Sequence, residues 1–318
     1  MPATTKRTAR PKTAPAAPSR TAITVKAQGI SLNVGLNEVN PQHYGGWDGK
    51  LVAAEADARQ METIAVSAGM QTQVLLSTSA TRARVLSGIK AAARTLVAGD
   101  LFLLSYSGNG GEVPDMNGDE ADRQDRTWCL YDAQLIDDEL HLELSRFSAG
   151  VRILVVSDTC HSGTVTRAVP LSIVPFGKES RTKFMPAAVT LRTYREHQAF
   201  YSRLQLDAAR ASAKKGVPRL SPPSARSAKQ QFISKTAPDL DGAVLLFSAC
   251  QTNQMALDGP TLSLFTSCLS EVWGRGAFKG GYARFLAAVK AAMPPSQTPE
   301  LVAIGKAREF ILQRPFTV

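Results

Sequence analysis

The chain has 318 residues, of which 44% are hydrophobic and 20% are charged, and a formal net charge of +10. This length and apolar content suffice for a full hydrophobic core, in one large domain or in a domain with an insertion. The four cysteines show no Cys-x-x-Cys spacing, which argues against a disulfide framework or a zinc site and for a reducing compartment. No apolar run of about 18 residues and no signal-peptide core occurs, so we expect a cytoplasmic protein that does not associate with a membrane.

The positive charge is concentrated in two segments. Residues 1–26 hold six Lys or Arg and no acidic residue, and residues 165–235 hold 14 Lys or Arg and three acidic residues. The rest of the chain holds 17 basic and 24 acidic residues, so it is acidic on balance. The N-terminal segment is typical of a disordered tail with weak attraction for polyanions. Because aromatic and basic residues do not interleave, we expect no specific nucleic-acid surface.

Strand and helix patterns alternate through the first half of the chain. Apolar periodicity predicts a strand at 30–36, a helix at 50–68, a strand at 73–76, a helix at 81–97, a strand at 101–106, a helix at 140–147 and a strand at 151–156. This alternation predicts an α/β fold, with a doubly wound, mainly parallel sheet and helices on both faces.

Periodicity fades between residues 165 and 241, where Pro, Ser, Ala and Arg accumulate around one expected helix at 193–214. A long irregular segment inside a domain indicates an insertion or a processed linker. The pattern returns with a strand at 243–248 and helices at 262–273 and 282–292. The chain therefore divides into a basic tail, a first part of the domain, a basic linker or insertion, and a second part of the domain, at residues 1–26, 27–164, 165–242 and 243–318.

Two of the expected strands end in polar motifs. Ser-Asp-Thr-Cys-His-Ser-Gly (157–163) follows one, and Ser-Gly-Asn-Gly-Gly (107–111) follows the other. Ligands bind at the carboxyl ends of parallel strands, so we expect both motifs in one site. Cys160 is the candidate nucleophile, because a thiolate at such a position can attack a carbonyl. Without the second motif, a lone cysteine after a strand would more simply be a small buried apolar residue.

The two motifs resemble those of the caspase-like cysteine peptidases of the peptidase C14 family, and more closely those of metacaspases. The resemblance extends from about residue 29 to residue 305, and further matches lie at 99–108, 128–132, 137–140 and 247–251. It implies a caspase-like fold in which a large-subunit-like part (27–164) and a small-subunit-like part (243–318) share one sheet. It also implies a cysteine endopeptidase with Cys160 as nucleophile and the backbone amides of Gly110 and Cys160 as oxyanion hole.

One position departs from the family pattern. The catalytic histidine of the family falls at position 109, where this chain has Asn109. An amide can donate a hydrogen bond but cannot carry a proton, so proton-transfer catalysis worth about 10²–10⁴-fold is lost. His161 adjoins Cys160 along the backbone, where neighbouring side chains usually diverge, and we expect His43 and His197 to be surface or core residues. The alternative function is therefore a catalytically inactive homologue that binds peptides or regulates a partner.

The resemblance also implies an acidic specificity pocket. Metacaspases line this pocket at positions that match Asp57, Ser107 and Asp158. Such a pocket would select a protein or peptide substrate with Arg or Lys before the scissile bond, through charge-assisted hydrogen bonds. Taken alone, Asp57 would be interpreted as an exposed carboxylate on a helix face.

Calcium is the cofactor that the resemblance suggests. Asp137 and Asp138 match a paired-aspartate calcium site of metacaspases, and Asp125 is a further candidate ligand in an acidic loop. Carboxylate clusters suit this ion. Another ligand position of the family is occupied by Arg167, and the loop lacks the EF-hand pattern, so a solvated acidic loop is the alternative.

Overall fold

The computed structural model describes residues 26–116, 118, 122–160, 181–214, 242–251 and 254–318. Within these residues the core of the molecule is a six-stranded sheet with the strand order β2-β1-β3-β7-β8-β9. The strands are β1 (Gly29–Gly35), β2 (Gln71–Leu76), β3 (Leu101–Ser107), β7 (Arg152–Asp158), β8 (Ala243–Ser248) and β9 (Glu300–Gly305). All neighbouring pairs are parallel except β8 and β9. The predicted fold class is thereby confirmed.

The central strands are buried on both faces. In β3, Leu101 and Leu103 pack into the core on one side of the sheet, and Phe102 and Leu104 pack into the core on the other. All four side chains are fully buried. A strand covered on both faces has no need of polar residues at alternate positions, which is why it appears in the sequence as a continuous apolar run.

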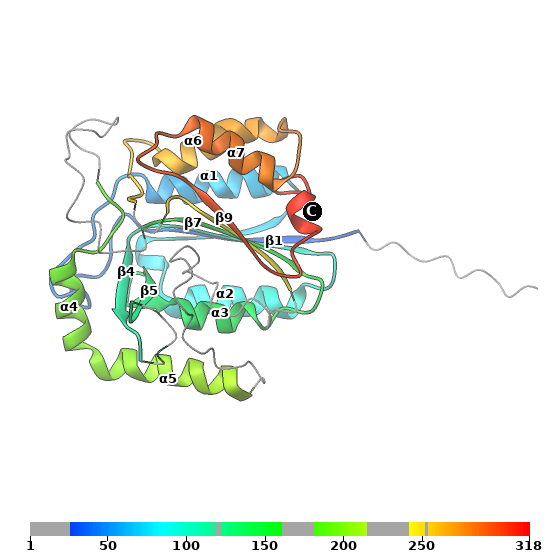
Figure 1. Cartoon of the computed structure of the whole chain (residues 1–318). Coiled ribbons are helices and arrows are strands. Elements are labelled where there is room, and N and C mark those ends of the chain that lie inside the picture. Colours follow the sequence, from blue (N-terminus) through cyan, green and yellow to red (C-terminus); the bar gives the residue numbers. More distant parts are fainter. Residues whose placement is uncertain (1–25, 117, 119–121, 161–180, 215–241, 252–253) are drawn as a thin grey trace, which may run out of the picture.

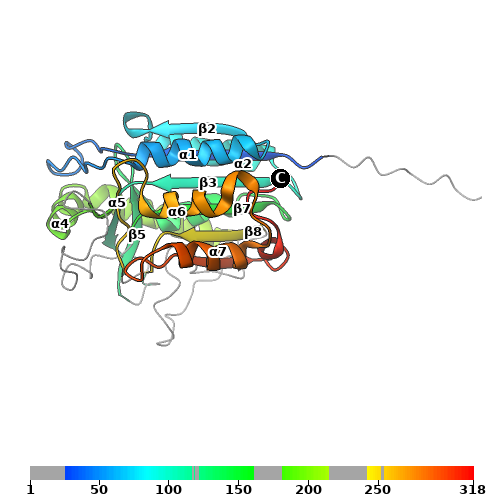
Figure 2. The same ribbon diagram turned by 90° about the horizontal axis from the view of Figure 1, so that it is seen from above.

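Helices cover the sheet on both sides (Figures 1 and 2). One side carries α1 (Ala54–Ser67), α6 (Leu264–Trp273) and α7 (Tyr282–Ala292), and the other carries α2 (Arg82–Thr95) and α3 (Asp137–Leu144). Two further helices, α4 (Ala187–Glu196) and α5 (Gln198–Lys214), follow on the α3 side, where α5 packs against α3. The layered arrangement leaves the carboxyl ends of β3 and β7 as the edge at which loops from both halves of the chain can meet.

A second, three-stranded antiparallel sheet was missed by the sequence prediction. It consists of β4 (Gly110–Pro114), β5 (Gln124–Cys129) and β6 (Gln134–Ile136). Strands β4 and β5 carry charged residues, among them Arg126, whose buried side chain pairs with Glu112 at 3.5 Å and with Asp122. Because these charged side chains are paired with each other, they can be accommodated in a sheet. A prediction from apolar periodicity, however, assigns such a charged segment to an exposed loop.

Several helix boundaries also differ from prediction; α3, for example, begins and ends three residues earlier than the expected 140–147. Helix α1 begins at Ala54 rather than at residue 50, because the backbone amides of Val52 and Ala53 donate to the carboxylate of Asp258 at 2.6 and 3.0 Å. This carboxylate satisfies amides at the helix start that would otherwise lack partners. The helix predicted at 193–214 is in fact two helices, which are divided at His197.

The division at His197 brings two histidines together. The rings of His43 and His197 stack with their centroids 4.1 Å apart, and Nε2 of His43 lies 2.6 Å from the hydroxyl of Tyr201. Burial and the neighbouring His197 lower the pKa of His43 from 6.5 to about 4. The folded protein therefore holds His43 neutral at a pH where the unfolded chain would protonate it.

This difference predicts a pH-dependent stability. Between pH 6.5 and about 4, the unfolded chain binds a proton at His43 that the folded chain does not, so the free energy of unfolding falls as the pH is lowered through this window. Thermal melts at half-unit pH steps should show a shallower decline for His43→Asn than for the unchanged chain, with parallel curves above pH 7. If the melting temperatures of the two proteins declined equally below pH 6.5, His43 would not contribute to the pH dependence of stability.

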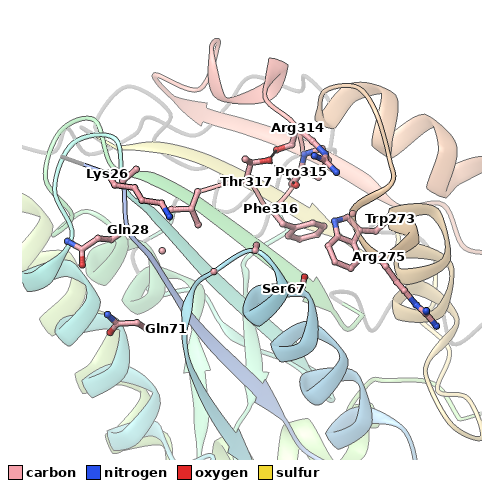
Figure 3. Close-up of a pocket in the computed structure, with 16 residues that line it drawn as sticks. Lys26, Gln28, Ser67, Gln71, Trp273, Arg275, Arg314, Pro315, Phe316 and Thr317 are labelled. Atoms are coloured by element: carbon pink, nitrogen blue, oxygen red, sulfur yellow. Dashed lines mark hydrogen bonds between the residues drawn. The ribbon is translucent and has the colours of Figure 1, made fainter. Parts of the chain in front are cut away.

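An open cavity of about 700 Å³ lies near the amino end of β1, at the edge of the sheet opposite the polar motifs (Figure 3). Its lining includes Lys26, Gln28, Ser67, Trp273, Arg314 and Phe316. None of the described residues that line it has a thiol, an imidazole or a carboxylate side chain. Among the described helices, none is both long and apolar enough to cross a membrane.

Candidate functional site

The two polar motifs meet at the carboxyl ends of β3 and β7. Ser107 and Asp158 lie directly opposite each other in the parallel pairing of these strands. Gly108, which follows β3, directs its amide toward the carbonyl oxygen of Asp158 at 3.5 Å. The expectation from sequence that both motifs share one edge of the sheet matches this arrangement.

The side chain of Asp57 reaches the same point from the first turn of α1. Its carboxylate accepts a hydrogen bond from the Ser107 hydroxyl at 2.7 Å, and only 1% of the residue is exposed. Asp57 is therefore not the exposed carboxylate that its helical position alone would suggest. The three residues that the resemblance assigned to one pocket lie together.

Two hydroxyl residues at the start of α6 complete this acidic cluster. Ser263 donates its amide and its hydroxyl to Asp57 at 2.9 and 2.5 Å, and its hydroxyl also contacts Asp158. The Thr266 hydroxyl donates to Asp158 at 2.9 Å. Burial raises the pKa of Asp158, and Asp57 raises it further, whereas Lys183 and the two hydroxyls favour its ionised form.

A lysine from the chain itself fills the cluster. Nζ of Lys183 lies 3.0 Å from Asp57, 2.8 Å from the Ser107 hydroxyl and 3.2 Å from Asp158, and the side chain is fully buried. Burial opposes the charged form of Lys183, but Asp158, Asp57 and Asp258 together hold the pKa of its ammonium above the ordinary value. Two carboxylates and one ammonium therefore form a buried ionic group.

The carbonyl oxygen of the same lysine lies between two backbone amides. It accepts hydrogen bonds from Gly110 at 3.1 Å and Cys160 at 3.2 Å, the pair that the resemblance suggests as an oxyanion hole. The two loops approach each other closely, because a Cβ atom on Gly110 would lie 1.8 Å from the carbonyl oxygen of Cys160. Only glycine fits here.

The Cys160 thiol belongs to the residue whose amide binds this carbonyl oxygen, and it is buried, with 1% of the residue exposed. Its sulfur accepts a hydrogen bond from the amide of Ala256 at 2.7 Å. Cys250 is a direct neighbour, and its hydrogen bond with Cys160, together with burial, raises the pKa of the Cys250 thiol well above its ordinary value. Cys250 therefore stays a neutral donor next to the candidate nucleophile.

Asn109 is buried next to Gly110, with 3% of the residue exposed. Its side-chain amide donates to the carbonyl oxygen of Gly49 at 2.7 Å, and its own carbonyl oxygen accepts from the Tyr106 hydroxyl at 2.7 Å and the Cys129 amide at 3.0 Å. The side chain and the backbone carbonyl group of Asn109 therefore both stabilise the conformation of the loop. A neutral amide in this position has no proton to give to a leaving group.

The other histidines do not replace the missing one in the described structure. His43 and His197 contact each other and the aromatic residues of α5, and His141 lies on α3, on the far side of the sheet from the acidic cluster. His161 lies outside the described residues. Of the four histidines, His161 is thus the remaining candidate for a substitute base.

The candidate calcium ligands lie in a different region, where β5 and β6 lead into α3. Asp125 and Asp137 are buried there, and Asp138 is half-buried in the first turn of the helix. Within the residues that the structure describes, no three Asp, Glu, His or Cys side chains are grouped as metal ligands. The requirement for calcium stays a prediction.

Several residues of the site were not found from sequence. Ser263 and Thr266 were hidden in a predicted helix, although two hydroxyls three positions apart at a helix start share one face. Ala256 lies near an apolar segment and has no distinctive motif. Cys250 lies in the matching segment 247–251, but the match gives it no role. Lys183 is one of 14 basic residues in a segment without periodicity, and nothing local distinguishes it from the others.

Comparisons with known proteins identify the family and a solved structure of similar fold. The sequence profile of the caspase domain of the peptidase C14 family matches residues 39–311. The crystal structure of protein GSU0716 from Geobacter sulfurreducens is 43% identical, has a TM-score of 0.77, and covers 92% of this chain and 99% of its own.

Two curated metacaspases match a shorter part. Metacaspase-1B of Aspergillus fumigatus is 36% identical over 89 residues, 26% of this chain and 22% of its own. Metacaspase-1 of Saccharomyces cerevisiae is 36% identical over 90 residues, 27% of this chain and 21% of its own. The chain thus spans about a fifth of the length of these relatives.

Proposed function

The chain belongs to the caspase-domain family of peptidases, and on that basis we propose that it is a cysteine-type endopeptidase that cleaves proteins after Lys or Arg. Cys160 is the nucleophile of this proposal, and Asp57, Ser107 and Asp158 form the pocket for the basic side chain. Ser263 and Thr266 orient the two carboxylates by hydrogen bonds.

In the proposed reaction, the ionised sulfur of Cys160 attacks the carbonyl carbon of the basic residue. The amides of Gly110 and Cys160 donate hydrogen bonds to the carbonyl oxygen as negative charge develops on it. The bond to the next residue then breaks, its nitrogen takes up a proton, and water hydrolyses the thioester to restore Cys160.

The observation that carries this proposal is the position of Lys183. Its ammonium contacts both carboxylates, and its carbonyl oxygen accepts from both amides. A residue bound in this way has its side chain in the proposed specificity pocket and its carbonyl oxygen on the amide of the candidate nucleophile, as cleavage after it would require. The acidic pocket excludes an Asp or Glu side chain, because like charges in a buried site repel.

Asn109 supports a second candidate function, a peptide-binding homologue with little turnover. Its amide is already bonded to Gly49, and it cannot protonate the departing nitrogen. Binding requires only the pocket and the amide pair, so a protein with this residue would bind a basic peptide and release it before cleaving it.

The test uses the Lys183→Ala variant, in which the pocket is vacated, and fluorogenic peptides that differ only in Arg, Lys or Asp before the cut. We expect Arg and Lys peptides to be hydrolysed at least about 100-fold faster than the Asp peptide, because the latter leaves buried charges unpaired. Adding Cys160→Ala should abolish hydrolysis. Paired assays with calcium and with a chelator examine the predicted calcium requirement.

Hydrolysis that survives Cys160→Ala, or that is equal for Asp and Arg peptides, would contradict the peptidase proposal. Tight binding of the Arg peptide without any cleavage would instead support the second candidate.

A further inference from the structure

The segment around Lys183 is bound along the site as an added strand. The amide of Lys183 donates to the carbonyl oxygen of Ala256 at 3.1 Å, and the amide of Asp258 donates to the carbonyl oxygen of Arg181 at 2.8 Å. Between these bonds, Thr182 pairs with Leu257 in an antiparallel bridge. Main-chain pairing of this kind is how extended peptides bind to an exposed sheet edge.

The pairing continues past the amide pair on the other side of Lys183. The amide of Met185 donates to the carbonyl oxygen of Gly110 at 2.8 Å, and Phe184 forms a parallel bridge with Gly110. Met185 is fully buried and Phe184 is 9% exposed. The backbone is therefore held on both sides of the Lys183–Phe184 peptide bond, with the carbonyl group of that bond on the two amides next to Cys160.

From this arrangement we propose that residues 181–185 are the chain's own substrate segment, and that the Lys183–Phe184 bond is its intramolecular cleavage site. The inference rests on the proposed function and goes beyond it, because it selects one bond among the many basic positions of the linker. While that bond is intact, the segment excludes other peptides from the pocket.

The cleavage is a hydrolysis and needs no reagent other than water. The Cys160 sulfur bonds to the carbonyl carbon of Lys183, the bond to the Phe184 nitrogen breaks, and that nitrogen takes up a proton to leave as an amine. Water then displaces the sulfur and gives a Lys183 carboxylate. Asn109 cannot supply the proton, so in the unchanged chain the segment stays bound and is cut about 10²–10⁴-fold more slowly than it would be with a histidine at this position.

Both fragments would remain together after the cut. Strand β7 precedes the cleavage site and β8 follows it, and the two are neighbours in the middle of the sheet. Each also buries apolar side chains on both faces. We therefore expect the cleaved protein to elute as one species and to separate only on denaturation.

The experiment introduces Asn109→His to restore a proton donor and analyses the incubated protein by N-terminal sequencing and intact mass. We expect one new N-terminus, at Phe184. Adding Lys183→Ala should abolish this cut, and adding Lys183→Arg should retain it. Arg195→Ala is the matched control, because Arg195 is an exposed basic residue in the last turn of α4, and it should leave the cut unchanged.

A cut elsewhere with the Lys183–Phe184 bond intact, in an Asn109→His protein that hydrolyses an added Arg peptide, would overturn the inference while leaving the proposed function standing. Failure to cleave either substrate would instead count against the proposed function.

A second measurement needs no catalysis. In the unchanged chain, the docked segment covers Cys160, so iodoacetamide should alkylate it slowly. Lys183→Ala should release the segment and raise the alkylation rate of Cys160 about tenfold or more, since access then no longer depends on local opening. Arg195→Ala should not change the rate, and buried Cys129 serves as an internal reference. Equal Cys160 rates in all three proteins would show that the segment is not the resident occupant and would overturn the inference.

Discussion

Replacing Asn109 with histidine is expected to raise hydrolysis of an Arg peptide by about 10²–10⁴-fold, the usual value of a positioned general acid and base. The surroundings are suited to the change. The carbonyl oxygen of Gly49, which now accepts from Asn109 at 2.7 Å, can accept from one imidazole nitrogen and leave the other for proton transfer. A histidine oriented by a second group is the arrangement on which cysteine and serine nucleophiles depend.

The measurement is kcat/KM for a fluorogenic Arg peptide in the presence of Lys183→Ala, so that self-cleavage does not limit the rate. Asn109→Gln provides the matched control, because it keeps an amide and should gain nothing. A histidine variant no faster than the glutamine variant would mean that the loop does not direct residue 109 toward the Cys160 sulfur.

Asp57→Ala is expected to give the largest loss of stability, about 3–5 kcal/mol, the range for removing one partner of a buried ion pair. Asp57 accepts from Lys183, from the Ser107 hydroxyl, and from the amide and hydroxyl of Ser263. Its removal leaves buried donors without an acceptor and the ammonium with Asp158 as its remaining carboxylate partner in the pocket. Every one of these groups is less than 4% exposed.

Urea denaturation followed by circular dichroism measures this loss. The control Glu271→Ala removes an exposed carboxylate from α6 and should change the free energy of unfolding by less than about 0.5 kcal/mol. Asp57→Asn should lower the free energy of unfolding by an amount between those of Asp57→Ala and the control, since an amide keeps some hydrogen bonds but not the charge. A loss for Asp57→Ala no greater than that of the control would mean that the pocket is hydrated and its charges are separated.

The central sheet was predictable from sequence because its strands are buried on both faces. Such strands appear as unbroken apolar runs, and those expected at 101–106 and 243–248 differ from the structure by at most one residue at either end. The edge strand β9 was not predicted, because several of its residues are partly exposed and its pattern is mixed.

The pocket was partly predictable. Ser107 and Asp158 follow apolar strands, so the sequence itself places them at one edge. The assignment of Asp57 to the pocket depended on the family resemblance, since nothing in a helical pattern distinguishes a buried carboxylate from an exposed one. Lys183 could not have been predicted, because its burial is the result of tertiary contacts with three separate elements, α1, β3 and β7.

The nucleophile and the bond it faces belong to one polypeptide, with Lys183 only 23 positions after Cys160 in the sequence. A tethered substrate of this kind has an effective concentration of the order of millimolar. Processing would therefore be first order, with a half-time independent of protein concentration. An added peptide would compete with the tethered segment only at comparable concentrations, so the affinity of the empty pocket for a basic peptide would be masked in any assay of the uncut chain.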